Sequence, residues 1–219
     1  RRWHTRCSRD WTSDVCSSDL TQKGLDEAFW NLESVDGTLP SLNFHTGILA
    51  VLFSHRMPWT SRRTTETLLF AALLCDIGLG LLPPELRRIK TRRMNPQQLR
   101  QYESHPDLSA TLLEHTKSKS ISENLLLIVR QHHEFCDGSG FPQKLTGEKT
   151  LMLSKLVVLC AEIVRTSSEL ILSPIDAVKN MFPEFSEKIF EEKPELVARF
   201  DRALLIQLFK WLNERREGG

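Results

Sequence analysis

The chain has 219 residues, of which 40% are hydrophobic and 26% are charged, and its formal net charge is +1. These values are typical of one soluble globular domain with a sizeable core. A charge so close to zero excludes a general electrostatic attraction to a nucleic acid polymer or to a membrane surface, so we expect neither as a partner.

Cysteine usage and apolar runs exclude three further classes of protein. The five cysteines are odd in number and irregular in spacing, which does not indicate a disulfide framework. The longest apolar runs, 68–75 and 156–160, are too short to span a membrane. The chain has no charged-then-apolar start of the kind that marks a secretion signal. We therefore expect a cytoplasmic protein.

The first twenty residues differ from the remainder. They hold two tryptophans and two cysteines among polar residues, without a helical or a strand period, and residues 10–20 resemble translated sequencing adapter. We treat 1–20 as a non-native or disordered segment, 21–40 as a lead-in and 41–219 as one helical domain. This division implies that the natural N-terminus is missing, together with any upstream sensor domain.

The domain is predicted to consist of one helix after another. Apolar residues at helical spacing predict helices over 42–55 and 64–77, the second of them central and buried. Asn95 followed by Pro96 starts a helix over 97–102, and another is expected over 106–115.

The second half continues in the same way. Ser120 with Glu123 has the spacing of a capping box and opens a helix over 124–133. A buried helix is expected over 151–167, a short one after Ser173-Pro174, and an amphipathic one over 197–216. Because no run alternates as a strand does, the predicted fold class is all-α, a single helical bundle.

Two segments carry the residues from which a metal site can be built. His132 and His133 are adjacent and are followed by Asp137 and a Gly-rich turn, while Cys75-Asp76 ends an earlier helix. Imidazoles that leave a helix beside a short polar turn can converge on a divalent ion. The sequence therefore predicts a metal site between the helices.

The order of these motifs resembles the HD-GYP family, a branch of the HD-domain metal-dependent phosphohydrolases. The matching stretches are 73–78 (Leu-Leu-Cys-Asp-Ile-Gly), 105–109 (His-Pro-Asp-Leu-Ser) and 132–142, and the match extends over roughly residues 40–180. The resemblance implies an HD-type bundle that encloses two or three divalent metals, usually Fe or Mn. It also implies hydrolysis of cyclic di-GMP and a role in bacterial signalling, with a cyclic dinucleotide and signalling proteins as partners.

The resemblance assigns roles by position. The metal ligands that it implies are His45, Cys75, Asp76, His105, His132, His133 and Glu162. The substrate-binding residues that it implies are Asp137, Gly138, Gly140, Phe141 and Pro142, with Arg165 as a substitute for missing cations. Asp76 is the expected catalytic residue, because its carboxylate can offer one oxygen to each of two ions.

Several positions depart from the family pattern, and they concern catalysis. Cys75 stands in place of a histidine, which shifts the expected metal preference toward Zn or Fe. Leu79 replaces a lysine, Ser41 replaces the glutamate of trinuclear members, and 168–173 lack the cations of a phosphate-gripping segment. We expect two ions if the site is intact, and reduced or lost hydrolysis.

Three functions remain open at this point. The first is a metal-dependent cyclic di-GMP phosphodiesterase, the second a non-catalytic module that senses cyclic dinucleotides or contacts proteins, and the third a phosphohydrolase on another phosphate ester. Two of these predicted ligands also have a simpler interpretation. His45 can be a hydrogen-bonded core histidine, and Cys75 can be a small buried apolar residue. The basic residues between Arg87 and Arg93 favour a solvated loop. The alternative is that they form a rim of the site that attracts a dianionic nucleotide.

Overall fold

The structure is a computed structural model that describes residues 37–88, 91–116, 118, 121–183 and 188–217. The expectations for 1–20 and for most of 21–40 lie outside these ranges. Within them, all regular structure is helical except for one isolated antiparallel bridge between Asp137 and Thr146. The prediction of an all-α fold is confirmed.

The helices follow one another along the chain without a strand between them. In order they are α2 (Leu39–Ser54), α3 (Arg62–Leu74), the 3-10 helix η1 (Ile77–Leu81), α4 (Pro84–Arg88), the 3-10 helix η2 (Thr91–Arg93), α5 (Pro96–Glu103), α6 (His105–His115), α7 (Glu123–Gln131), α8 (Met152–Leu170), α9 (Pro174–Met181), α10 (Ile189–Glu192), α11 (Pro194–Val197) and α12 (Arg202–Glu217).

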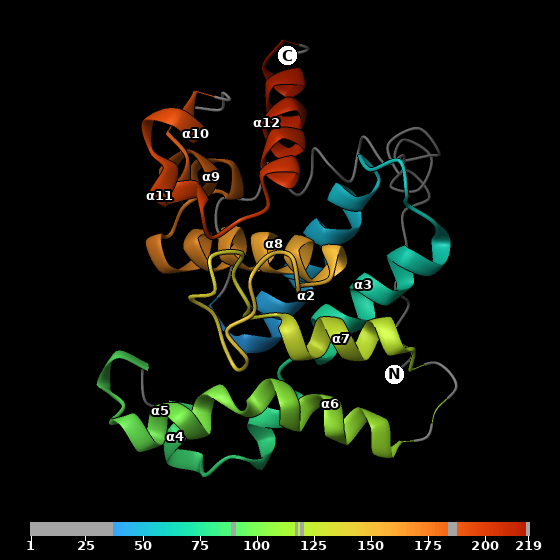
Figure 1. Cartoon of the computed structure of the whole chain (residues 1–219), viewed down its shortest axis with the longest axis vertical. Coiled ribbons are helices and arrows are strands. Elements are labelled where there is room, and N and C mark those ends of the chain that lie inside the picture. Colours follow the sequence, from blue (N-terminus) through green and yellow to red (C-terminus); the bar gives the residue numbers. More distant parts are fainter. Residues whose placement is uncertain (1–36, 89–90, 117, 119–120, 184–187, 218–219) are drawn as a thin grey trace, which may run out of the picture.

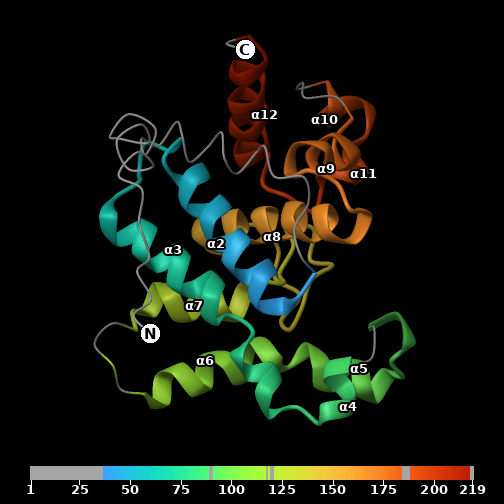
Figure 2. The ribbon, with the colours of Figure 1, turned by 180° about the vertical axis from the view of Figure 1, so that it is seen from behind.

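These helices form three tiers (Figure 1). α4, α5 and α6 lie at one end, α2, α3, α7 and α8 form the middle, and α9 to α12 lie at the other end, as the view from behind also shows (Figure 2). α2 packs mainly against α3 and α8, while α6 packs against η1 and α7. The boundary between the first two tiers is therefore made by α6, α7 and the chain that follows α3.

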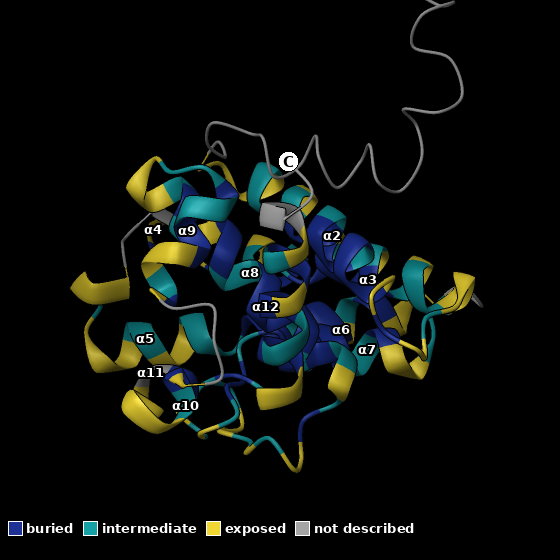
Figure 3. Ribbon diagram, turned by 90° about the horizontal axis from the view of Figure 1, so that it is seen from above, coloured by how far each residue is buried: buried dark blue, intermediate teal, exposed yellow. Residues whose placement is uncertain are grey.

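The core lies where the middle tier meets α12. Buried residues gather on α2, α8 and α12 (Figure 3). On α8 the fully buried side chains include Leu156, Leu159 and Ile163, which follow the helical spacing expected from the sequence. Phe53 of α2 stacks on Trp211 of α12, with ring centroids 5.6 Å apart. The last helix is thus part of the core.

Capping residues set several helix boundaries. Asn95 and Gln98 form a full capping box at the start of α5. The cap of α7 is Ser122, whose hydroxyl accepts the Leu125 N–H at 3.2 Å, so the predicted pairing of Ser120 with Glu123 is wrong. The predicted helix over 197–216 is interrupted, because Asp201 caps α12 by accepting the backbone N–H of Ala203 at 3.0 Å.

One stretch of the described chain, Arg62–Leu81, is apolar and long enough to cross a membrane by length and composition alone. The core helix of a folded domain meets the same criterion. Here the stretch is two elements, since α3 ends at Leu74 and η1 begins at Ile77. α3 packs against α2 and α7, but the prediction of a buried helix is wrong in part: Leu68, Ala71 and Ala72 are buried, whereas Phe70 on the other face is 51% exposed.

Candidate metal centre

Asp76 lies at the break between α3 and η1, because α3 ends at Leu74, three residues before the predicted end at Ile77. The break is fixed by Gly78, whose backbone N–H donates to the Ser109 hydroxyl at 2.8 Å. A Cβ on Gly78 would lie 2.5 Å from the backbone oxygen of His105 and the backbone nitrogen of Ser109. Only glycine permits this approach, which brings Asp76 to the start of α6.

Two histidines face Asp76 with a defined tautomer. The Nδ1 atom of His105 lies 2.7 Å from the backbone oxygen of Tyr102, and that of His132 lies 2.7 Å from the backbone oxygen of Val129. A carbonyl oxygen can only accept, so each Nδ1 donates a proton. In the neutral ring each Nε2 then presents a lone pair, as in the metal-binding histidines of known sites.

The lone pairs converge on one carboxylate oxygen. Asp76 Oδ1 lies 3.1 Å from His105 Nε2 and 3.5 Å from His132 Nε2, and the two Nε2 atoms are 3.4 Å apart. Metal bonds of about 2.1 Å at tetrahedral or octahedral angles separate neighbouring ligands by about 3.0 to 3.4 Å. The three atoms are therefore spaced as the ligands of one ion would be.

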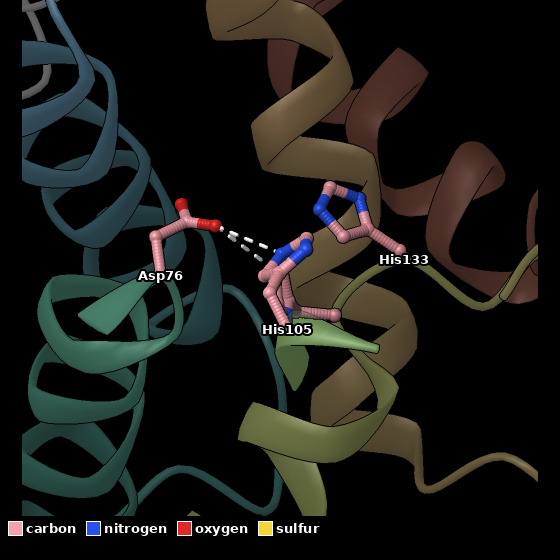
Figure 4. Close-up of side chains that lie close together, drawn as sticks. Asp76, His105 and His133 are labelled. Atoms are coloured by element: carbon pink, nitrogen blue, oxygen red, sulfur yellow. Dashed lines mark hydrogen bonds and ion pairs between the residues drawn. The ribbon is translucent and has the colours of Figure 1, made fainter. Parts of the chain in front are cut away.

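His133 completes a group of four. Ligand atoms of Asp76, His105, His132 and His133 all lie within 4.8 Å of one another, and Figure 4 shows the carboxylate pointing toward the imidazole rings. Phe141 stacks on His133 with ring centroids 4.4 Å apart. Three imidazoles and one carboxylate suit Zn, Fe or Mn.

Electrostatics keep the group ready to bind a cation. Burial by itself would raise the pKa of Asp76, but the interactions of its carboxylate with the side chains of His105 and His132 outweigh burial and hold that pKa well below its usual value. Burial is the main cause that lowers the pKa of His133 well below its usual value. The aspartate is therefore ionised and His133 is neutral, the forms in which each binds a metal.

The turn after the histidines is held by a buried glutamate. The carboxylate of Glu134, 1% exposed, accepts the backbone N–H groups of Gln143 at 2.6 Å and Leu145 at 2.8 Å. Gly140 lies so close to the backbone of His133 and Glu134 that a Cβ would collide with both. This packing places Phe141 on His133. The Phe141-Pro142 peptide bond is cis.

The remaining predicted substrate residues belong to the same turn. The Asp137 carboxylate accepts the backbone N–H of Ser139 at 2.9 Å, and Gly138 has a φ of 76°, in the left-handed region. Asp137 is exposed, and its interactions shape the turn. Arg165 lies on α8 and donates to Glu162 and Glu169.

Three of the predicted ligands lie outside the group of four. His45 donates from Nδ1 to the backbone oxygen of Ser41 at 2.7 Å. The Cys75 thiol is directed to the backbone oxygen of Ala72 at 3.2 Å and lies 3.6 Å from Asp76 Oδ2. Burial, together with the charge of Asp76, raises the pKa of this thiol, which keeps it protonated.

Glu162 is the third ligand outside the group. Its carboxylate accepts hydrogen bonds from Arg165 at 2.6 and 3.2 Å and lies 3.8 Å from Arg199 Nη1. It is thus engaged by cations. Of the seven ligands that the resemblance implied, the structure brings four together.

Three further residues of this region were not predicted from the sequence: Glu134, Tyr102 and Arg199. Glu134 was read only as part of a motif, although an acid between His133 and Phe135 is an unusual choice for a buried position. Tyr102 supplies the carbonyl that orients His105 and lies 5.1 Å from its ring. Arg199 is far along the chain, and no local pattern connects it to the site.

Comparison with known proteins identifies the wider family of this arrangement. A family model described as an HD domain matches residues 39–168. The cyclic di-GMP phosphodiesterase PdeB of Borreliella burgdorferi is 27% identical over 123 residues, which are 53% of this chain and 31% of that protein.

A solved structure gives the same fold. Bd1817, a HDG"Y"P protein from Bdellovibrio bacteriovorus, matches with a TM-score of 0.61 and 21% identity, covering 87% of this chain and 57% of that one. At this identity the likeness concerns the fold. The chain spans 31% of the length of the first relative and 57% of the second, so both are longer than the region that they share with it.

Proposed function

We infer a function from one premise: this chain belongs to the HD domain family and is of the HD-GYP type. We propose that Asp76, His105, His132 and His133 hold one divalent ion, Fe or Mn, with Zn as the alternative. We propose further that this centre binds a cyclic dinucleotide, cyclic di-GMP in the first place, and that its hydrolysis is slow or lost.

The observation that carries the metal proposal is the convergence of lone pairs on Asp76 Oδ1. Two Nε2 atoms and a carboxylate oxygen lie 3.1 to 3.5 Å apart, and the Nδ1 protons of both histidines are engaged by backbone carbonyls. Without a cation or an additional proton between them, these lone pairs repel one another. The arrangement is therefore favourable only when a positive charge lies among them.

The residues have separable tasks around such an ion. The chemistry that a divalent ion supplies in this kind of site is polarisation of a phosphoryl oxygen and acidification of water. Asp76 provides the negative charge that balances the ion, and Tyr102 and Val129 fix the two imidazoles through their carbonyls. Phe141 covers His133 and limits the access of water to it.

The slow or absent hydrolysis rests on the position of Cys75. Its thiol is turned to the backbone of α3, and it is not one of the four grouped ligands. A second ion would lack this ligand, and Leu79 has no charge to offer a phosphate. The same observation favours the second candidate, a module that binds the nucleotide and passes the signal to proteins without cleaving it.

The setting of this function is also proposed. The three cysteines of the described chain, Cys75, Cys136 and Cys160, are free thiols, which supports a reducing compartment such as the cytoplasm. Signalling proteins would be the partners there. A phosphohydrolase acting on another phosphate ester is separated from the first candidate by a substrate screen.

The test uses the whole chain, purified without oxygen and loaded separately with Mn²⁺ and Fe²⁺. We expect one ion per chain, binding of cyclic di-GMP, and loss of the ion in Asp76→Ala. Turnover to the linear dinucleotide that disappears in Asp76→Ala would show a working phosphodiesterase. Metal and nucleotide binding without turnover would identify the binding module, and a chain that takes up no metal would refute the proposal.

A further inference from the structure

Arg199 lies outside the region that the HD domain model matches, in the short segment between α11 and α12. Its backbone oxygen accepts the N–H of Cys136 at 2.9 Å. Its guanidinium carbon lies over the ring of Phe135, 3.6 Å from the centroid. A distant part of the chain is therefore fastened to the residues that directly follow the histidine pair.

The guanidinium of Arg199 is held in place but is not engaged by hydrogen bonds. Its nearest carboxylate is Glu162, at 3.8 Å, which is beyond hydrogen-bond distance. Within the described ranges no protein acceptor takes a hydrogen bond from this side chain, which is 40% exposed. Stacking uses the face of a guanidinium, so the donors on its edge remain available.

Arg165, the cation that the sequence suggested for phosphate binding, differs from Arg199 because its guanidinium is engaged by hydrogen bonds. Three of its N–H groups donate to carboxylates: two to Glu162, at 3.2 and 2.6 Å, and one to Glu169, at 2.9 Å. These ion pairs raise the pKa of Arg165 further. A phosphate would have to displace two glutamates from it, whereas it would have to displace no hydrogen bond from Arg199.

Arg199 lies next to the segment that carries the histidine pair, because it contacts Phe135 and Cys136, two and three residues after His133. Its Nη1 atom lies 3.8 Å from Glu162 of α8, whose carboxylate accepts hydrogen bonds from Arg165. On its other side Arg199 acts on Asp137: burial opposes a low pKa there, but hydrogen bonds with Ser139 and the charge of Arg199 produce one. Arg199 therefore lies between α8 and the turn.

We propose that Arg199 binds a phosphate group of the cyclic dinucleotide and supplies the cation that residues 168–173 lack. The inference rests on the proposed function. A guanidinium that is pre-oriented by an aromatic ring, with its edge donors available, matches the planar fork that recognises phosphate oxygens. Its origin beyond residue 168 makes the C-terminal segment a part of the ligand site.

The experiment measures the affinity of the metal-loaded whole chain for cyclic di-GMP by calorimetry. Loss of a charge-assisted contact in Arg199→Gln is expected to weaken binding about tenfold or more. Arg199→Lys keeps the charge but loses the fork, so we expect an intermediate affinity. The matched control is Arg202→Gln, which removes a guanidinium stacked 4.7 Å over a different ring, Phe190, and is expected to stay within about twofold of the unchanged chain.

The outcomes separate this inference from the proposed function. If the unchanged chain binds cyclic di-GMP and Arg199→Gln binds it equally well, the inference is overturned and the proposed function stands. A larger loss in Arg165→Gln than in Arg199→Gln also overturns it. If the unchanged chain does not bind, the nucleotide proposal fails as well. Metal content and melting temperature identify a misfolded Arg199→Gln protein, in which case Arg199→Lys decides.

Discussion

Each imidazole of the cluster is defined by where it carries its proton. The Nδ1 protons of His105 and His132 are donated to carbonyls three residues earlier in the chain, at 2.7 Å in both cases. The i−3 carbonyl is available because each histidine stands just after a helix has ended, at the start of α6 and as the C-cap of α7. The orientation of both rings is thus a local consequence of helix termination.

Tyr102, the single tyrosine of the chain, provides a direct probe of this site. Burial raises its pKa to about 12, with the charge of Asp76 as a second cause. Because the folded pKa is raised above the unfolded value of about 10, the contribution of the neutral phenol to stability is fully present below about pH 10. It is lost as the pH rises toward about 12.

Tyrosinate absorbance of the metal-free protein checks this expectation. The folded chain should titrate near pH 12, whereas the chain in urea should titrate near about pH 10. In Tyr102→Phe the absorbance change should vanish. The free energy of unfolding should then no longer show the decrease above about pH 10 that ionisation of the phenol causes. Titration of the folded chain at the unfolded value would contradict the burial of the phenol beside Asp76.

In the proposed function, Cys75 is the residue that limits the centre to one ion. We expect Cys75→His to raise the metal content from one toward two ions per chain, since a second imidazole-binding position would adjoin Asp76. Adding Leu79→Lys should then raise turnover of cyclic di-GMP about tenfold or more, the scale of one charged group at a reacting phosphate. Metal analysis and a turnover assay measure the two effects separately.

The single variant Leu79→Lys is the control for this pair. It should leave the metal content at one ion, because a lysine side chain is no metal ligand here. A metal content that stays at one ion in a folded Cys75→His protein would show that the second position is blocked by something other than Cys75.

Among the elements, the turn between α7 and α8 depends most on a single side chain. Glu134 holds two backbone N–H groups from Gln143 and Leu145 in a buried position, and the turn in turn holds Phe141 against His133. The glycines of this turn could be recognised in the sequence. The buried acid that closes it is a tertiary feature, since its partners are nine and eleven residues away.

Replacing this acid should loosen the turn. In Glu134→Gln one of the two N–H groups faces an amide NH₂ group instead of an oxygen, so we expect a loss of about 2 kcal/mol or more in the free energy of unfolding. The metal should also dissociate more readily, because His133 loses its support. Urea denaturation and metal release by a chelator measure the two effects.

Glu148→Gln serves as the comparison for this change. Glu148 is exposed in the same loop, so its replacement should alter stability by about 0.5 kcal/mol or less. Equal losses in the free energy of unfolding of the two variants would show that the loop responds to charge in general. The two hydrogen bonds of Glu134 would then contribute no specific stabilisation.

For the molecule as a whole, the C-terminal segment is joined to the HD domain by contacts of several kinds. Trp211 of α12 is 1% exposed and stacks on Phe53 of α2. Lys155 of α8 forms an ion pair with Asp201 at 2.9 Å, with both side chains largely buried. The matched HD region therefore shares one core with the segment beyond it, through α12.

Removal of the large ring should show how much this shared core contributes. We expect Trp211→Ala to lower the free energy of unfolding by about 3 to 5 kcal/mol, the range for a buried aromatic residue. Trp59→Ala, which removes a ring that is 38% exposed, should cost about 1 kcal/mol or less. Similar losses in urea denaturation would show that α12 is not a part of the cooperative core.

The sequence by itself determined the fold class, most of the helices and the motifs of the centre. Helical apolar spacing and end residues such as Asn95 are local signals, and His132-His133 with the turn to Pro142 is a local motif. For this reason the all-α fold could be predicted, whereas the four grouped residues were predicted from the resemblance to the HD-GYP family. Ser120 was predicted as the cap because it has Glu123 three residues later, whereas the observed cap, Ser122, has Leu125 at that spacing and caps α7 through its hydroxyl alone.

Only the tertiary structure decided which of the seven predicted ligands come together and what surrounds them. Cys75 and Glu162 were predicted as ligands from the resemblance, but the thiol is turned to its own helix and the glutamate accepts hydrogen bonds from Arg165. Arg199 reaches the site from beyond the matched region. The direction of a side chain depends on partners that are distant in sequence, and spacing along the chain contains no information about them.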